Sequence, residues 1–384
     1  MRWRFVSWSG LGAAALLLAI GGAWILSLPP APVVGAAAPP IAKEEADATI
    51  AALKPPKRLR PLVAIVGIND ATETTDYLMP YGILRRADVA DVVALGTEAG
   101  PVALFPALKL APQATVADFD VRHPDGADYV IVPAMSRDDD PAALKWIKGQ
   151  AAKGAIIISI CAGAKILAEA GLLDGKRATT HWYYLEELRD RHPAIHYVAD
   201  RRLVVDRNVA TTTGITASLP MMLTLIEAIA GRDKAEAVGR ELGLTDWDAR
   251  HDSGAFKFTR PFAFTAIGNT LAFWNRDRFG IELAAGVDEV SLALVVDAWS
   301  RTYRSRAVTV AGSVGELASR NGIRIIPDEI ATAWPASRLL PSVGTRQPAR
   351  ALDEALHGIE TRYGRRTADF VAMQLEYPTQ RPLQ

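Results

Sequence analysis

The sequence predicts an α/β fold with a mostly parallel sheet, and two recurring patterns predict it. Short, continuous apolar runs occupy residues 62–67, 129–132 and 155–160, and such runs are typical of strands buried on both faces. A segment with helical spacing that ends at a glycine, residues 165–171, follows the third run. Strands that alternate with helices indicate βαβ units and therefore a parallel sheet.

The single cysteine of the chain is the first candidate for chemistry. Cys161 directly follows the run at residues 155–160 and precedes the helix at 165–171, as in a nucleophile elbow. A helix N-terminus favours the thiolate, so we expect a lowered thiol pKa. His181 follows the next turn and is expected to orient or deprotonate the sulfur. The alternative is an inert, buried cysteine.

Residues 159–182 resemble the PfpI/Parkinson-associated deglycase superfamily, whose members are related to class I glutamine amidotransferases. The resemblance covers about Leu62 to Gly243 and is closest to the sensor domain that precedes the DNA-binding module of AraC-type regulators. It implies a flavodoxin-like three-layer sandwich. It also implies that Asp76, which begins an acid-x-x-x-Pro pattern, lies beside the cysteine as a protonated partner. The alternative for Asp76 is a helix N-cap.

The resemblance implies two backbone oxyanion donors, the N–H groups of Ala162 and Ala134. Around Ala134 the chain departs from the family, since Pro133-Ala-Met135 replaces Pro-Gly-Gly, and alanine resists backbone geometry that glycine permits. The isonitrile hydratases of the superfamily carry a threonine directly after the cysteine. Ala162 has no hydroxyl, which makes isonitrile hydration less expected.

Composition excludes several classes of function. Lys plus Arg equals Asp plus Glu at 43 each, so no basic field favours direct nucleic-acid binding, and the helix-turn-helix module of the AraC-type relatives is not expected. One cysteine excludes an internal disulfide and a cysteine-based metal cluster. His192 and His196 have the spacing of a metal pair, but Pro193 between them favours a surface turn. We therefore expect no metal and no other cofactor.

The N-terminus predicts a membrane anchor. Residues 11–28 are uncharged and apolar, a length that suits a single span. Arg2 and Arg4 precede this run, so the positive-inside rule predicts an inner-membrane protein whose remainder is periplasmic or extracellular. The alternative is a cleaved signal peptide. Residues 1–30 are thus interpreted as the anchor, and Pro/Ala-rich residues 31–60 as a stiff, extended linker.

The expected domains are residues 61–243, which carry Cys161, and residues 244–384, which lack a cysteine. Helices and strands at 287–299, 306–310, 322–328 and 351–375 repeat the order of those in the first domain. They suggest a truncated second copy, although any α/β segment shows such alternation. The second half is expected to pack or pair, as a pseudo-dimer within the chain or in a homodimer.

Two functions remain open from the sequence. The first is a hydrolase or lyase that uses Cys161, His181 and Asp76 on a small amide, carbonyl or nitrile-like electrophile. The second is a non-catalytic small-molecule or redox sensor, related to the AraC-type regulators, that acts through a partner. In both, the expected ligand is a small molecule.

Overall fold

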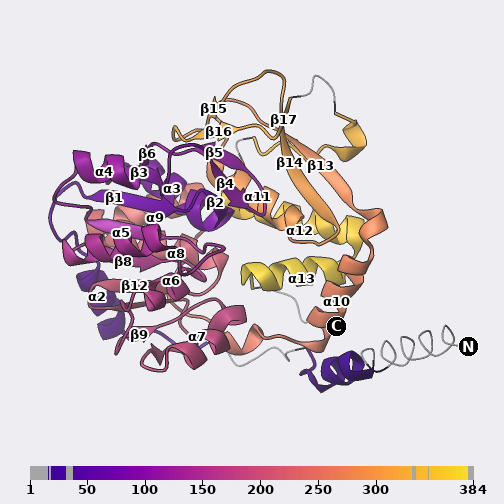
Figure 1. The fold of residues 1–384 in the computed structure, drawn as a ribbon, viewed down its shortest axis with the longest axis horizontal. Coiled ribbons are helices and arrows are strands. Elements are labelled where there is room, and N and C mark those ends of the chain that lie inside the picture. The colour runs from indigo at the N-terminus through magenta and orange to yellow at the C-terminus, as the bar shows by residue number, and fades with distance from the viewer. Residues whose placement is uncertain (1–15, 17–18, 32–37, 331–333, 345, 379–384) are drawn as a thin grey trace, which may run out of the picture.

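The first half of the chain is built around a seven-stranded sheet. The computed structural model describes residues 16, 19–31, 38–330, 334–344 and 346–378 (Figure 1). The strands in spatial order are β11 (Leu203–Asp206), β12 (Val209–Thr212), β8 (Ile156–Ser159), β7 (Tyr129–Val132), β1 (Leu62–Gly67), β3 (Asp91–Gly96) and β6 (Ala114–Thr115). Only β11 runs antiparallel to its neighbour. The predicted α/β fold with a mostly parallel sheet is confirmed.

Helices cover both faces of this sheet, and β1 shows why. Val63 and Ile65 share one hydrophobic core with the first group of helices, while Leu62, Ala64 and Val66 share another with the second group, because side chains alternate across a strand. The first group is α3 (Thr74–Ala87), α8 (Ser218–Ala230) and α9 (Arg232–Leu242). The second is α4 (Val116–Arg122), α5 (Pro141–Ala152), α6 (Gly163–Glu169) and α7 (Leu185–Arg191). A small pair, β9 (Arg177–Ala178) and β10 (His196–Tyr197), lies outside the main sheet.

The second half forms a smaller α/β unit. Helix α10 (Arg260–Leu271) leads into a parallel three-stranded sheet of β13 (Asp277–Glu282), β14 (Ser305–Ala311) and β17 (Glu329–Ile330). The other elements are α11 (Glu289–Ser300), β15 (Leu317–Ala318), β16 (Arg324–Ile326), α12 (Pro348–Tyr363) and α13 (Arg365–Leu375). Figure 1 shows α12 and α13 below this sheet.

The two halves share a sheet and a core. Strand β16 pairs antiparallel with β5 (Lys109–Ala111), which continues through β4 (Val102–Phe105) to β2 (Asp70–Glu73). Helix α11 packs against α3, and a Cβ at Gly82 would lie 2.5 Å from the Val290 side chain. A larger residue than glycine would therefore separate the two helices.

The order of elements repeats between the halves. The series β13-α11-β14-β15-β16-β17 follows the same order as β1-α3-β3-β4-β5-β6, apart from β2. Reciprocal ion pairs join the facing helices, since Arg86 near the end of α3 pairs with Asp288 before α11, and Arg301 after α11 pairs with Glu73 before α3. This correspondence favours the internal duplication, which stays a prediction.

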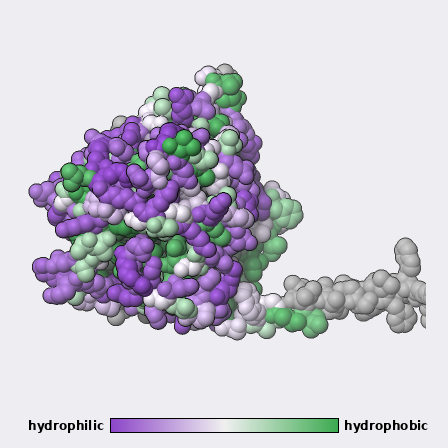
Figure 2. Space-filling view, turned by 60° about the vertical axis from the view of Figure 1, so that its left-hand side comes forward, coloured by the Kyte–Doolittle hydropathy of each residue, from purple (hydrophilic) through white to green (hydrophobic). Residues whose placement is uncertain are grey.

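The N-terminal predictions need correction. No helix within the described ranges is long and apolar enough to cross a membrane, so the prediction of a single-pass inner-membrane protein is wrong. Positions 11–15 and 17–18 of the predicted span lie outside the described residues. Figure 2 shows apolar residues of this segment at the edge of a largely hydrophilic face.

The predicted extended linker is also partly wrong. Residues 43–52 form helix α2 (Lys43–Ala52), which packs against α8 and β11. The Leu53 carbonyl accepts a hydrogen bond from the Tyr129 hydroxyl at 2.6 Å, and Arg201 pairs with Glu45 at 2.7 Å. These contacts with distant residues stabilise a helix that the Pro/Ala-rich composition did not predict.

Candidate functional site

Cys161 lies on a tight turn between β8 and α6, as the sequence predicts. Its φ of +57° is in the left-handed region, which non-glycine residues rarely adopt. Its N–H donates to Thr212 Oγ1 at 3.0 Å, and its carbonyl accepts from Thr180 Oγ1 at 3.3 Å. A Cβ at Gly163 would lie 2.2 Å from the Val132 carbonyl oxygen, so this turn requires glycine at that position.

The thiol environment contradicts the prediction of a lowered pKa. Cys161 is only 5% exposed, and burial raises its pKa well above the ordinary value. The nearby carboxyl groups of Asp76, Glu73 and Glu376 raise it further, while the Ala162 N–H, bonded to the sulfur, lowers it. Burial and the nearby carboxyl groups therefore raise the thiol pKa more than the N-terminus of the short helix α6 lowers it, so the Cys161 side chain is a thiol.

Asp76 lies beside this thiol and is not the cap of its helix. The N-cap of α3 is Glu73, whose carboxylate accepts the Asp76 N–H at 2.6 Å. Asp76 Oδ2 accepts the Ala134 N–H at 3.0 Å, and Oδ1 is buried without a hydrogen-bond partner among the described residues. Burial, and next the Glu73 carboxylate, raise the pKa of Asp76 well above its ordinary value. Since Oδ2 is an acceptor, the proton belongs on Oδ1.

The two predicted oxyanion donors differ in this structure. The Ala162 N–H is bonded to the Cys161 sulfur, close to where a reacting atom would develop charge. The Ala134 N–H is instead bonded to Asp76. An anionic intermediate would reach the Ala134 N–H only if Asp76 moved.

His181 is near the cysteine, but its ring nitrogens bond to the backbone. Nδ1 accepts the Tyr183 N–H at 3.2 Å, and Nε2 lies 3.0 Å from the Gln374 carbonyl oxygen. A carbonyl only accepts, so Nε2 carries the hydrogen. Burial lowers the pKa of His181, so the ring is neutral. The structure brings Asp76 and His181 to the same site, but the His181 ring is not directed at the thiol.

Several residues of the site were not predicted from the sequence. Arg301 donates to Glu73 Oε1 at 2.7 Å and to both oxygens of Asp297 at 2.8 Å, and its charge interacts with Cys161. Glu376 accepts the Trp182 N–H, and its charge acts on His181. Glu73 caps α3 although the residues preferred at an N-cap are Ser, Thr, Asp and Asn, so the sequence carries no strong signal for it. Arg301 and Glu376 carry no local signal.

A metal centre is not among the site's features. Within the described part of the chain, no group of three or more His, Cys, Asp or Glu side chains is placed to hold a metal ion. His192 contacts Glu169 at 3.4 Å at the end of α7, and His196 lies in β10. The two histidines thus belong to different surface elements.

Comparison with known proteins identifies the family. Residues 63–228 match the DJ-1/PfpI family. The isonitrile hydratase of Pseudomonas putida is 35% identical over 172 residues, which are 44% of this chain and 72% of that protein. The chain belongs to the DJ-1/PfpI family. The Parkinson disease protein 7 homolog of Danio rerio is 28% identical over 190 residues, 48% of this chain and 97% of that protein.

A regulator is also among the relatives of this DJ-1/PfpI protein. The HTH-type transcriptional regulator CdhR of Pseudomonas aeruginosa is 34% identical over 112 residues, which are 29% of this chain and 33% of that protein. The family thus includes both an enzyme and a regulator among the relatives of this chain. Family membership alone does not decide between the two functions.

A cavity of about 640 Å³ adjoins the DJ-1/PfpI site. Thr180, which bonds the Cys161 carbonyl, and Trp182, which follows His181, line it together with Glu376 and His251. Half of its other lining residues are aromatic: Trp24, Tyr183, Tyr197, Phe256 and Phe258. Thr180 thus links this cavity to the cysteine.

The raised thiol pKa can be measured directly. Cys161 is the only cysteine, so the rate of iodoacetamide alkylation, followed by intact mass, reports on this residue. We expect the rate to rise with pH through a midpoint above about 8.5, the value of a free cysteine. The same chain in denaturant is the control and should titrate near 8.5. A native midpoint at or below the denatured one would contradict the described environment.

Proposed function

We propose that the DJ-1/PfpI domain is a cysteine-dependent hydrolase or lyase that acts on a small, neutral amide, carbonyl or nitrile-like electrophile. The observation that carries this proposal is a buried thiol near a buried Asp76 whose pKa is raised and whose Oδ1 has no hydrogen-bond partner among the described residues. A buried acid with a raised pKa is a suitable proton donor at neutral pH.

The pair supports a simple sequence of proton transfers. As the Cys161 sulfur bonds to the electrophilic carbon, the Asp76 proton moves to the oxygen or nitrogen of the substrate, and the thiol proton moves to the Asp76 carboxylate. The Ala162 N–H is placed to stabilise developing negative charge. With a nitrile-like substrate, water then adds to the thioimidate, and the C–S bond breaks to release the amide and restore the thiol. With an amide substrate, the protonated amine leaves first, and water then hydrolyses the remaining thioester to release the acid and restore the thiol.

The substrate class follows from the enclosure of the site. A charged substrate would lose its hydration beside Asp76, Glu73 and Glu376, at a high cost in free energy. A small neutral electrophile avoids this cost. The related isonitrile hydratase supports an electrophile with a carbon–nitrogen multiple bond, whereas Ala162 makes the isonitrile itself less expected.

His181 has a more limited role in this proposal than the sequence suggested. Its neutral ring is held by Tyr183 and Gln374, so it orients the loop beside the thiol. It becomes a base only if Nδ1, which carries the lone pair, is released from the Tyr183 N–H. Asp76 is therefore the principal proton-transfer group.

A second function, a non-catalytic sensor, is favoured by one observation. Both ring nitrogens of His181 are engaged and the thiol is almost fully covered, which suits a site that opens in response to a ligand or an oxidant. In that case Cys161 would be oxidised or would bind a small molecule, and the second half of the chain would pass the change to a partner.

An activity screen that compares the wild type with a Cys161→Ala variant tests the proposal. The full chain and its Cys161→Ala variant would be incubated with a panel of small nitriles, amides and aldehydes, and product formation would be followed by mass spectrometry. We expect turnover of at least one class by the wild type, and loss of turnover in Cys161→Ala. Turnover that survives in Cys161→Ala would contradict the proposed nucleophile. Stable peroxide-driven oxidation of Cys161 without any turnover would favour the sensor.

A further inference from the structure

We propose that Glu376, from the second half of the chain, is a positioning residue that holds the His181 loop in place beside Cys161. The site of the DJ-1/PfpI domain is thereby completed by a side chain outside residues 63–228. The inference rests on the proposed function in naming His181 as part of the site, but the contacts that carry it are independent of any substrate.

The Glu376 carboxylate joins two segments of the site. Its Oε1 accepts the Trp182 N–H at 2.8 Å, and its Oε2 accepts the Gly214 N–H at 2.8 Å. Trp182 follows His181, and Gly214 follows β12, which supplies the Thr212 contact to Cys161. The side chain is 1% exposed, and charge-assisted hydrogen bonds of this kind are among the stronger ones in proteins.

The fit around this carboxylate is close. A Cβ at Gly214 would lie 2.6 Å from the Glu376 side chain, so glycine is required there. The Glu376 carbonyl accepts the Thr216 hydroxyl at 2.9 Å, and its φ of +49° turns the chain sharply after α13. His251 Nε2 lies 3.4 Å from Oε2. These contacts hold the Glu376 side chain in a single conformation.

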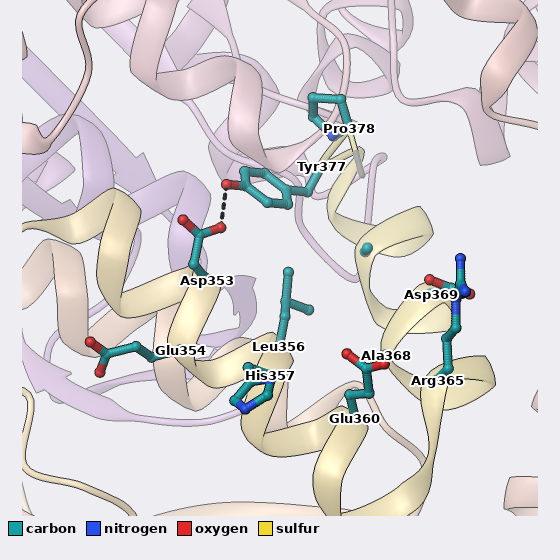
Figure 3. Close-up of a pocket in the computed structure, with 11 residues that line it drawn as sticks. Asp353, Glu354, Leu356, His357, Glu360, Arg365, Ala368, Asp369, Tyr377 and Pro378 are labelled. Carbon is teal, nitrogen blue, oxygen red and sulfur yellow. Dashed lines mark hydrogen bonds and ion pairs between the residues drawn. The ribbon is translucent and has the colours of Figure 1, made fainter. Parts of the chain in front are cut away.

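The backbone that carries Glu376 is itself held by the second half. Tyr377, the next residue, donates its hydroxyl to Asp353 on α12 at 2.6 Å (Figure 3). Gln374 donates to the Arg301 carbonyl at 3.1 Å, and the Met373 carbonyl accepts the Trp182 indole N–H at 2.9 Å. Helices α11, α12 and α13 thus fix the residue that fixes the His181 loop.

Two contacts therefore fix the position of His181. The Gln374 carbonyl sets its tautomer, and Glu376 holds the backbone of the following residue. Because the carboxylate also lines the aromatic cavity, loosening it should open the path between that cavity and Cys161.

Substitution of Glu376 tests the inference on the full chain. Glu376→Gln places an amide NH₂ opposite one of the two backbone N–H donors, so one hydrogen bond is lost. We expect native iodoacetamide alkylation of Cys161 at fixed pH to accelerate about tenfold, the change that corresponds to about 1.4 kcal/mol in the opening equilibrium. In ¹⁵N-histidine spectra, we expect His181 to change from the pure Nε2–H tautomer to a mixture.

Two further variants keep the test sharp. Glu376→Asp keeps a carboxylate on a shorter side chain, so it should recover part of the wild-type alkylation rate and tautomer. Glu360 lies on α12 and lines a second pocket, which is drawn in Figure 3 and is separate from the aromatic cavity. Glu360→Gln removes the same charge as Glu376→Gln and should leave both readouts unchanged. Circular dichroism identifies any variant that unfolds.

The outcomes are distinct. If Glu376→Gln and Glu376→Asp are folded and both match the wild type in alkylation rate and His181 tautomer, the inference is wrong. If Glu360→Gln has the same effect as Glu376→Gln, the effect comes from charge and the positioning role is also wrong. Neither readout requires a substrate, so failure of the proposed function would leave this result interpretable.

Discussion

Replacing Arg301 by methionine is expected to lower the free energy of unfolding by about 3–5 kcal/mol, the usual cost of removing one partner from a buried ion pair. The Arg301 side chain is 14% exposed, while those of Glu73 and Asp297 are 8% and 0% exposed. Methionine would leave both carboxyl groups buried without their cation. Because Arg301 belongs to the second half and Glu73 to the first, the loss should also weaken the junction between them.

Urea unfolding followed by circular dichroism would measure this change. Arg189→Met is the matched control, since Arg189 is 55% exposed and, among the described residues, pairs with Glu186 within α7; its effect should be below about 1 kcal/mol. The triple variant Arg301→Met/Glu73→Gln/Asp297→Asn should recover part of the loss, because it removes the uncompensated charges. An Arg301→Met variant as stable as the control would show that this network does not hold the two halves together.

Replacing Asp76 by asparagine is expected to lower turnover of any discovered substrate about 100-fold or more, the scale of general acid–base assistance. Asparagine keeps an oxygen that can accept the Ala134 N–H and has nearly the same shape. It lacks the transferable proton on Oδ1. The loss should therefore appear in kcat without a matching loss of stability.

Steady-state kinetics and thermal unfolding on the same samples would check this expectation. Asp174→Asn, at an exposed turn, is the control and should retain full activity. Unchanged turnover in Asp76→Asn would exclude the proposed proton donor. If the protein is a redox sensor, the same variant should instead accumulate less sulfinic acid at Cys161 after peroxide, because a carboxyl hydrogen bond to that group is lost.

The elements near Cys161 were predictable because their signals are local. The apolar run at residues 155–160 predicts β8, and the following glycines and alanines predict the turn into α6. The acid-x-x-x-Pro pattern placed Asp76 at the start of α3. The thiol pKa was predicted in the wrong direction, because the burial of Cys161 and its neighbouring carboxyl groups come from separate segments of the chain.

The predictions for the N-terminal segment were wrong because they rested on hydropathy and composition alone. An uncharged run predicts a membrane span by length and hydropathy alone, but no described helix is long and apolar enough for one. Likewise, composition predicted an extended linker where α2 packs against the domain. Hydropathy and composition report what a segment tolerates, whereas the packing partners decide its conformation.

The sequence by itself determined the alternation of strands and helices, the position of the single cysteine on its elbow, and the family that these motifs indicate. Only the tertiary structure decided the surroundings of the site: the burial of Cys161, a His181 ring held by the backbone, and the contacts of Arg301 and Glu376 from the second half. The physical reason is separation along the chain. Periodicity and capping act within a few residues, whereas burial and charge act between residues that only folding brings together.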